Sequence, residues 1–230
     1  MFGETKIEKD VYHVTEILNP PLIVYLRRTK NYYVSPHKFA FTLLGSGVHS
    51  VLEEAKSIIN RAKKGDYTFE KENTFKAALS VLGKKVYLTG TPDLIIHSRG
   101  ELWDFKVVKY YYEGLNLMRG LWNESKYPLQ LNIYRAFSNP SEIKRLFIQM
   151  HLKDYNQKMM EKGIAPITVV EIPTWPVEQV TQEVMLRLNN IISMFDGKTF
   201  LPCSKDDTWG GLRCAYYCFV KDVCPIYEKK

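Results

Sequence analysis

The stretch GTPDLIIHSRGELWDFK, residues 90–106, decides the fold that the sequence predicts. Apolar residues fill two short runs in it, 94–96 and 102–103, and a turn-forming Ser-Arg-Gly lies between the runs. Two apolar runs of this length around such a connection are typical of a β-hairpin. We therefore expect two strands joined by a tight turn at Arg99-Gly100.

The register of this hairpin decides which side chains share a face. We take Ser98 to pair with Glu101 across the turn. Asp93 then lies opposite Lys106, and Asp104 lies diagonal to it on the same face. A three-residue loop would shift the register by one and send these side chains to opposite faces. The tight turn thus predicts two carboxylates and one ammonium group in a small patch.

Such a patch has the chemistry of a metal site. Two carboxylates this close repel each other unless a cation lies between them, and their oxygens suit a hard ion such as Mg²⁺ or Mn²⁺. The ion would activate water for phosphodiester hydrolysis, while Lys106 orients the nucleophile or neutralises developing charge. A lone Asp-x-Lys is more often an ordinary pair of surface salt bridges, so the interpretation depends on further motifs.

Three motifs, in this order along the chain, resemble the RecB-like PD-(D/E)xK nuclease superfamily. They are GSGVHSVLE at residues 45–53, Pro92-Asp93 followed by Asp104-x-Lys106, and the Q-x3-Y pair of Gln130 and Tyr134. The resemblance spans residues 40–224 and implies a restriction-endonuclease-like α/β core, with a mixed central sheet flanked by helices. Helices and strands alternate along the chain in a way that fits this class.

The resemblance also assigns roles to single residues. It implies one or two Mg²⁺ or Mn²⁺ ions held by four residues: His49, Asp93, Asp104 and the carbonyl of Phe105. Lys106 would position the attacking water. Gln130 would hold the DNA backbone or a group of the active site, with Tyr134 supporting it, although a tyrosine beside Leu131 also suits a core position.

Further acidic residues surround these motifs. Glu53 lies four positions after His49 on the same helical face. Glu70 or Glu72 occupies the place where related nucleases often have an acidic residue on the first strand, and an exposed strand charge is an equally good interpretation.

Hydrophobic periodicity predicts the remaining elements. We expect a single nuclease domain with an N-terminal helical part (1–65), a catalytic α/β core (66–175) and a C-terminal helix with a cysteine segment (176–230). Expected helices cover 46–64, 128–136 and 177–195, with a short one near 22–26. Expected strands include 67–69, 77–81, 86–88, 144–153 and 167–173, and residues 113–126 form a polar connection.

All four cysteines lie near the C-terminus, as Cys203-x10-Cys214-x3-Cys218-x5-Cys224. Four thiols so close together in an intracellular-looking chain favour metal ligation over disulfides. They supply the ligands of a tetrahedral zinc ion or of a [4Fe-4S] cluster, and the spacing does not choose between the two. The segment resembles the iron-sulfur ending of AddB and of CRISPR-associated adaptation nucleases, but it lacks their N-terminal cysteine. We therefore expect the cluster to staple only the C-terminal segment.

Composition and charge point to the class of partner. The chain has 230 residues and a formal net charge of +7. Basic clusters such as Arg61-x-Lys63-Lys64, together with the tyrosines of 110–112, favour a nucleic acid with unpaired bases. The charged N-terminus and the lack of a long apolar run predict a cytoplasmic protein without membrane contact, and the tail's resemblance to phage-encoded members suggests a viral gene.

The predicted function is that of a Mg²⁺- or Mn²⁺-dependent DNA exonuclease acting on DNA ends or on single strands, in recombination, repair or phage DNA processing. Two alternatives remain at this stage. One is a non-catalytic nucleic-acid-binding module that serves a helicase or recombinase, and the other is a structure-specific or restriction-type endonuclease.

Overall fold

A computed structural model describes residues 8–34, 43, 46–47, 50–51, 67–69 and 74–227. The chain divides into two compact units. Unit 1 comprises Met1–Phe39, Lys76–Thr89 and Gln182–Lys230, and unit 2 comprises Ala40–Phe75 and Gly90–Thr181. Most of the helix expected at 46–64 lies outside the described residues, and so do His49, Glu53, Glu70 and Glu72.

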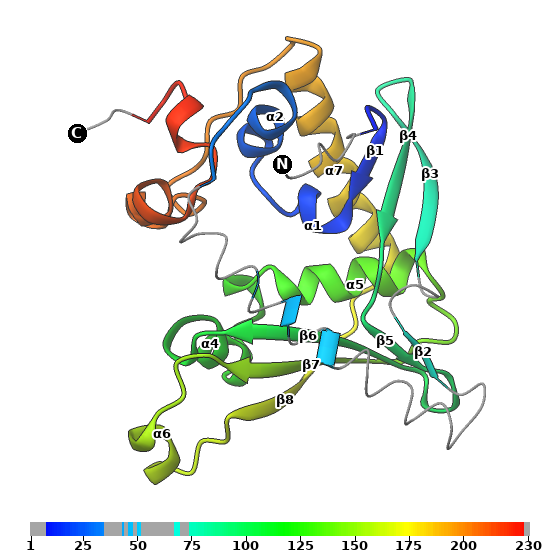
Figure 1. The fold of residues 1–230 in the computed structure, drawn as a ribbon. Helices are drawn as coiled ribbons and strands as arrows, with labels where there is room; N and C mark the ends of the chain where they lie inside the picture. Colours follow the sequence, from blue (N-terminus) through cyan, green and yellow to red (C-terminus); the bar gives the residue numbers. More distant parts are fainter. Residues whose placement is uncertain are drawn as a thin grey trace. The chain divides into compact units, whose positions relative to one another are not determined.

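Unit 2 contains a five-stranded mixed sheet in the order β2-β5-β6-β7-β8. The strands β6 and β7 pair in parallel, and the other neighbours are antiparallel. The sheet runs through the centre of this unit (Figure 1). The bounds are β2 (Tyr67–Phe69), β5 (Leu94–Ile96), β6 (Glu101–Val108), β7 (Arg145–Leu152) and β8 (Ile167–Ile172). The expected mixed sheet is therefore present, and the expected strands lie within a few residues of these bounds.

The hairpin of β5 and β6 differs from the expected tight turn. Ile96 pairs with Glu101, and a 3-10 turn, η2 (His97–Arg99), with Gly100 joins the strands. Gly100 has a φ of +61°, a left-handed conformation that favours glycine. The predicted pairing of Ser98 with Glu101 is wrong by two residues. Because side chains alternate with a period of two, this shift keeps every side chain on its predicted face.

Helix α5 (Tyr127–Phe137) lies over one face of this sheet, beside β6 (Figure 1). Its start is favoured by Pro128 in the first turn, where the missing N–H costs no hydrogen bond. The side chain of Asn132 is fully buried, and its Oδ1 accepts a hydrogen bond of 2.7 Å from the N–H of Trp175, in the connection between β8 and the helix 177–195. The helix thus has fixed contacts beyond its own turns.

The connection from β6 to α5 is helical, where the sequence led us to expect a polar loop. It contains a π-helical turn, η3 (Tyr110–Gly114), then α4 (Leu115–Met118) and a 3-10 turn, η4 (Trp122–Glu124). Between β7 and β8 there is a short helix, α6 (Gln157–Glu161), capped by the side chain of Asn156. The polar composition of both segments gave no signal for these short helical turns.

Unit 1 has its own three-stranded sheet, in the order β1-β4-β3. The bounds are β1 (Val11–His13), β3 (Phe75–Val81) and β4 (Lys84–Gly90). Leu82 and Gly83 both have positive φ, as a two-residue hairpin turn requires. The single central sheet of the prediction is thus two separate sheets.

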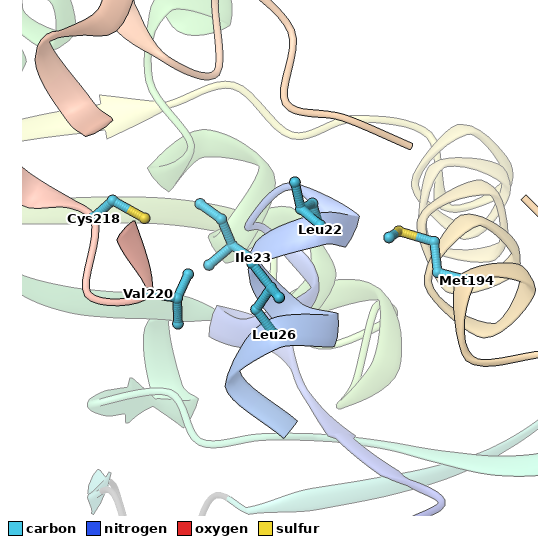
Figure 2. Close-up of a cluster of buried hydrophobic side chains, with 6 residues drawn as sticks. All are labelled: Leu22, Ile23, Leu26, Met194, Cys218 and Val220. Carbon is cyan, nitrogen blue, oxygen red and sulfur yellow. The ribbon is translucent and has the colours of Figure 1, made fainter. Parts of the chain in front are cut away.

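The helices of unit 1 build its core. They are α1 (Val14–Ile17), α2 (Pro21–Thr29) and the main part of α7 (Val177–Phe195), whose bounds agree with the predicted 177–195. A cluster of buried side chains joins α2 and α7 to the cysteine-bearing tail (Figure 2). It consists of Leu22, Ile23, Leu26, Met194, Cys218 and Val220. In the described part of the chain, no helix is long and apolar enough to cross a membrane.

Candidate active site and cysteine pocket

Asp93 and Asp104 come together where β5 begins and β6 passes beside it. Continuing the observed register by one residue places Asp93 directly opposite Asp104. Oδ2 of Asp93 accepts a hydrogen bond of 2.5 Å from the N–H of Phe105. Asp93 is 6% exposed and Asp104 is 1% exposed, so both carboxylates lie away from bulk water. Burial of two carboxylates at one point requires a compensating positive charge.

Part of that charge comes from Lys106, which lies two residues after Asp104 on the same face of β6. Its Nζ lies 2.5 Å from Oδ2 of Asp104. The contact is an ion pair without hydrogen-bond geometry, and Oδ2 of Asp104 is a buried oxygen that has no hydrogen-bond partner among the described residues. An acceptor in this state can take a further cation or donor. The sequence predicted this assembly of Asp93, Asp104 and Lys106 on one face.

The Q-x3-Y pair lies on the buried face of α5. Nε2 of Gln130 donates a hydrogen bond of 2.8 Å to Oη of Tyr134, and both residues are less than 5% exposed. The ring of Tyr134 packs against Gly90 so closely that a Cβ added there would lie 2.8 Å from Cε1. Gly90 ends β4 three residues before Asp93. Gln130 and Tyr134 are therefore placed to position the segment that carries Asp93.

Two residues that the sequence interpretation missed extend the site. Tyr127, at the start of α5, lies on the same helical face as Gln130 and Tyr134, and its ring centre is 5.3 Å from Nζ of Lys106. Burial is the main cause that raises its pKa, and the charges of Glu113 and Asp104 add to the shift. The i, i+3, i+7 spacing of these three residues was the signal available in the sequence.

Glu113, in η3, is the second missed residue. Burial raises the pKa of its carboxyl group, while the hydroxyl of Ser125 and the charge of Lys126 act in the opposite direction. Its Oε2 is buried and lacks a hydrogen-bond partner within the described ranges. No sequence motif singles out this residue, because its burial results from the π-helical turn.

The oxygen atoms of the site fit a hard divalent cation. Mg²⁺ is commonly held by one or two carboxylates together with water and substrate phosphate. Asp104, with its buried oxygen that lacks a hydrogen bond, and Asp93 supply two such carboxylates, and the carbonyl of Phe105 directly follows Asp104 in the chain. No group of three or more His, Cys, Asp or Glu side chains is arranged to hold a metal ion in the described ranges. The predicted third ligand, His49, lies outside them.

The four cysteines line one pocket in unit 1, together with apolar residues of α2. The lining includes Cys203, Cys214, Cys218, Cys224, Leu22, Ile23 and Leu26. None of the cysteines forms a disulfide. Figure 2 shows Cys218 pointing toward the α2 side chains, with Ile23 between it and Leu22. Four free thiols around one pocket are the ligand type and number that a thiolate-bound metal needs. Among the described residues, however, no three of these thiols lie close enough together to hold a metal ion as they stand.

The tail also packs on α2, a helix near the N-terminus. Nη2 of Arg213 donates a hydrogen bond of 2.9 Å to Oδ1 of Asn19. Apolar side chains of α2 therefore join the tail to the N-terminal part of unit 1. That a metal cluster ligated by the tail cysteines staples only the C-terminal segment stays a prediction.

The environment of two of the thiols, Cys203 and Cys214, raises their pKa values. Burial, with a smaller contribution from Asp207, raises the pKa of Cys203 to about 12. Burial also raises the pKa of Cys214, and the neighbouring Cys218 and Cys224 add to the effect. A bound cation would reverse this balance, since metal ligation requires thiolates.

Comparison with solved structures supports the fold. The chain is similar to SSO0001, with 20% sequence identity and a TM-score of 0.62, over 96% of this chain and 89% of that one. At this identity the likeness establishes a shared fold alone. No family model and no curated protein matches the sequence.

Two exonucleases of known structure are more loosely similar. A phage related exonuclease from Haemophilus somnus 129PT has 14% identity and a TM-score of 0.45, over 80% of this chain and 79% of that one. An alkaline exonuclease from Laribacter hongkongensis has 9% identity and a TM-score of 0.39, over 82% of this chain and 91% of that one. These two scores are too low to carry an argument about function.

Proposed function

We propose that this protein is a Mg²⁺- or Mn²⁺-dependent deoxyribonuclease, and that it acts as an exonuclease on DNA ends or on single strands. The observation that carries the proposal is the pairing of Asp93 and Asp104 beside Lys106, with a buried oxygen of Asp104 that lacks a hydrogen bond. A pure binding module has no need to bury two carboxylates at one point, because burial of charge costs free energy.

Each residue has a chemical role in this proposal. Asp93 and Asp104, with the carbonyl of Phe105, would hold the divalent cation, and His49 is the further ligand that the sequence motif suggests. When bound, the cation would supply an activated water and neutralise charge on the phosphate. Lys106 holds a positive charge at the edge of the carboxylate pair, where it orients the nucleophile and stabilises the negative charge that develops on the phosphate oxygens.

Gln130, Tyr134 and Tyr127 act by position. The bond between Gln130 and Tyr134 and the contact of Tyr134 with Gly90 fix the segment before Asp93. The ring of Tyr127 limits where the ammonium group of Lys106 can move. A rigid arrangement of this kind raises the rate because the reacting groups need no rearrangement in the transition state.

The cysteine pocket is proposed to hold a [4Fe-4S] cluster, with zinc as the alternative. Four thiols line the pocket beside the apolar α2 side chains, and four thiolates fill every coordination position that the protein supplies to a zinc ion or a [4Fe-4S] cluster. No position is then open for catalysis, which supports a structural role. The thiols would bind the metal as thiolates and hold the tail on α2. A helicase or recombinase partner remains part of the proposal, since DNA ends are commonly presented by such proteins.

The test is a nuclease assay on end-labelled linear and on covalently closed circular single-stranded DNA, with Mg²⁺ or Mn²⁺. The wild type is compared with Asp104→Asn and with Asp206→Asn, which removes an exposed carboxylate of the tail. We expect the wild type and Asp206→Asn to degrade only linear DNA, and Asp104→Asn to degrade neither. Cleavage of the circle would mean an endonuclease, and no cleavage by the wild type would favour the non-catalytic binding module.

A further inference from the structure

Two lysines lie side by side where β6 and β7 end. Val108 and Leu152 form the last pair of the parallel register, so Lys109 and Lys153 follow at equivalent positions. The N–H of Lys153 donates a hydrogen bond of 3.0 Å to the carbonyl of Val108, which fixes the two backbones together. Both side chains are exposed. This end of the sheet therefore presents two ammonium groups to solvent.

The charge of Lys109 acts on Lys153. Partial burial lowers the pKa of Lys153, and the charge of Lys109 lowers it further, while Asp154 acts in the opposite direction. Oδ1 of Asp154 accepts a hydrogen bond of 2.8 Å from the N–H of Tyr110, so this carboxylate is held at the backbone of η3. An anion bound between the lysines would relieve their repulsion.

An exposed aromatic side chain follows directly. Tyr111 is 63% exposed, and Tyr110 packs edge-on against its ring with 5.1 Å between the ring centres. The π-helical turn that carries Tyr111 starts at the residue held by Asp154. Tyr111 follows Lys109 by two residues, so this segment carries both kinds of side chain that proteins use to bind single-stranded nucleic acid, a cation for the phosphate and an aromatic ring for base stacking.

We infer that Lys109 and Lys153 bind a backbone phosphate of single-stranded DNA and that Tyr111 stacks on an adjoining unpaired base. The inference rests on the proposed nuclease function, because Lys109 directly follows the strand that carries Asp104. The two positions are ~17 Å of extended chain apart, and side-chain alternation turns Lys109 to the face opposite Asp104, so the DNA would pass around the end of β6 to reach both. In a duplex the base faces are covered by their neighbours, so Tyr111 makes the site selective for unpaired DNA.

The experiment measures binding by fluorescence anisotropy, with a labelled thymidine oligonucleotide and with a duplex of equal length, in EDTA so that no metal-dependent cleavage occurs. The wild type is compared with Lys109→Ala/Lys153→Ala and with Tyr111→Ala. The matched control is Arg99→Ala/Lys144→Ala, which removes two exposed positive charges from the opposite ends of the same two strands. Thermal midpoints establish that each variant is folded.

We expect the lysine variant to bind the single strand about tenfold more weakly, and the salt slope of its binding to fall by ~0.7, the value for one lost phosphate contact on a single strand. Tyr111→Ala should lower the affinity for the single strand by about tenfold and leave the affinity for the duplex unchanged. The control should bind like the wild type. Equal affinities of the lysine variant and the wild type, or an equal loss in the control, would overturn the inference.

The two proposals fail in different ways. If the wild type cleaves DNA while the lysine and tyrosine variants bind it normally, the binding site is wrong and the nuclease stands. If binding depends on these residues and the wild type cleaves nothing in either metal, the nuclease is wrong and the binding site is supported.

Discussion

The buried carboxylate of Asp104 depends on Lys106 for its charge balance. The Asp104 side chain is 1% exposed and that of Lys106 is 17% exposed, so the pair is largely shielded from water. Removing one partner of a buried pair leaves an uncompensated charge. We predict that Lys106→Met lowers the free energy of unfolding by about 3 kcal/mol, measured by urea denaturation in EDTA.

Two controls accompany this prediction. Asp104→Asn/Lys106→Met removes both charges and should recover most of the loss, since neither group is then unpaired. Lys84→Met breaks the pair of Lys84 with Asp196, in which the lysine side chain is half exposed, and should cost less than about 1 kcal/mol. A Lys106→Met protein as stable as the wild type would contradict the charge-balance argument.

Gly90 is the second residue whose size matters. A Cβ on Gly90 would lie 2.7 Å from a ring carbon of Phe75 and 2.8 Å from one of Tyr134. We predict that Gly90→Ala destabilises the protein by about 1–3 kcal/mol, because both rings must move. The control is Gly47→Ala, because a Cβ added at Gly47 meets nothing within 4 Å. Gly163 also has open space around it, but its positive φ would strain an alanine there. If Gly90→Ala were neutral while cleavage was lost, the steric account of this contact would be wrong.

At the scale of elements, the turn η3 and the start of α5 bury Glu113. Its folded-state pKa is raised, so the folded protein holds this proton more tightly than the unfolded chain. The stability that results is fully present below the unfolded pKa and is lost as pH rises through the raised folded value. We therefore predict that Glu113→Gln is more stable than the wild type at neutral pH, and that the difference shrinks toward acid pH.

The measurement is the thermal midpoint of both proteins across the acid-to-neutral range. Glu161→Gln is the control, because Glu161 is exposed on α6. If the difference in thermal midpoint between Glu113→Gln and the wild type grew toward acid pH, the pKa of Glu113 would not be raised in the folded protein, and the account of its burial would be wrong.

The elements also show what the sequence could predict. The bounds of α7 follow from its apolar spacing, and the faces of Asp93, Asp104 and Lys106 were predicted although the turn was not. A shift of two residues preserves the alternation of a strand, so the prediction survived an error in the loop. Glu113 was missed because a π-helical turn has no sequence period that a helix or strand pattern reveals.

For the molecule as a whole, the prediction failed where residues far apart in the sequence meet. The two sheets and the α2 wall of the cysteine pocket depend on pairings between distant segments, which local patterns do not encode. The packing of the tail on α2 was therefore not predicted, while the cluster and the nature of its metal stay predictions.

The joining of the tail to α2 gives a prediction at this scale. Ile23 is 8% exposed in the core cluster, and Ile23→Ala should lower the free energy of unfolding by about 2–4 kcal/mol. Ile226→Ala, at a half-exposed position of the tail, should change it by less than about 0.5 kcal/mol. Equal effects of the two substitutions would contradict the packing of the tail on α2.

The proposed metal of this pocket is tested by metal analysis and thermal unfolding of anaerobically prepared protein. We predict bound iron in the wild type, or zinc if the alternative holds. Cys218→Ser should lose the metal, and its thermal midpoint should equal that of the metal-depleted wild type. A wild type with neither metal, or a metal-free variant with an unchanged midpoint, would argue against a structural cluster.

The most direct test of the central claim is the rate at which label is released from end-labelled linear single-stranded DNA as Mg²⁺ is increased. The comparison is between the wild type and Asp104→Asn/Lys106→Met, whose charges are balanced and whose folding is checked independently. We predict release that rises with Mg²⁺ for the wild type and no release for the double variant at any concentration. Release by the double variant at the wild-type rate would show that Asp104 and Lys106 do not carry the reaction.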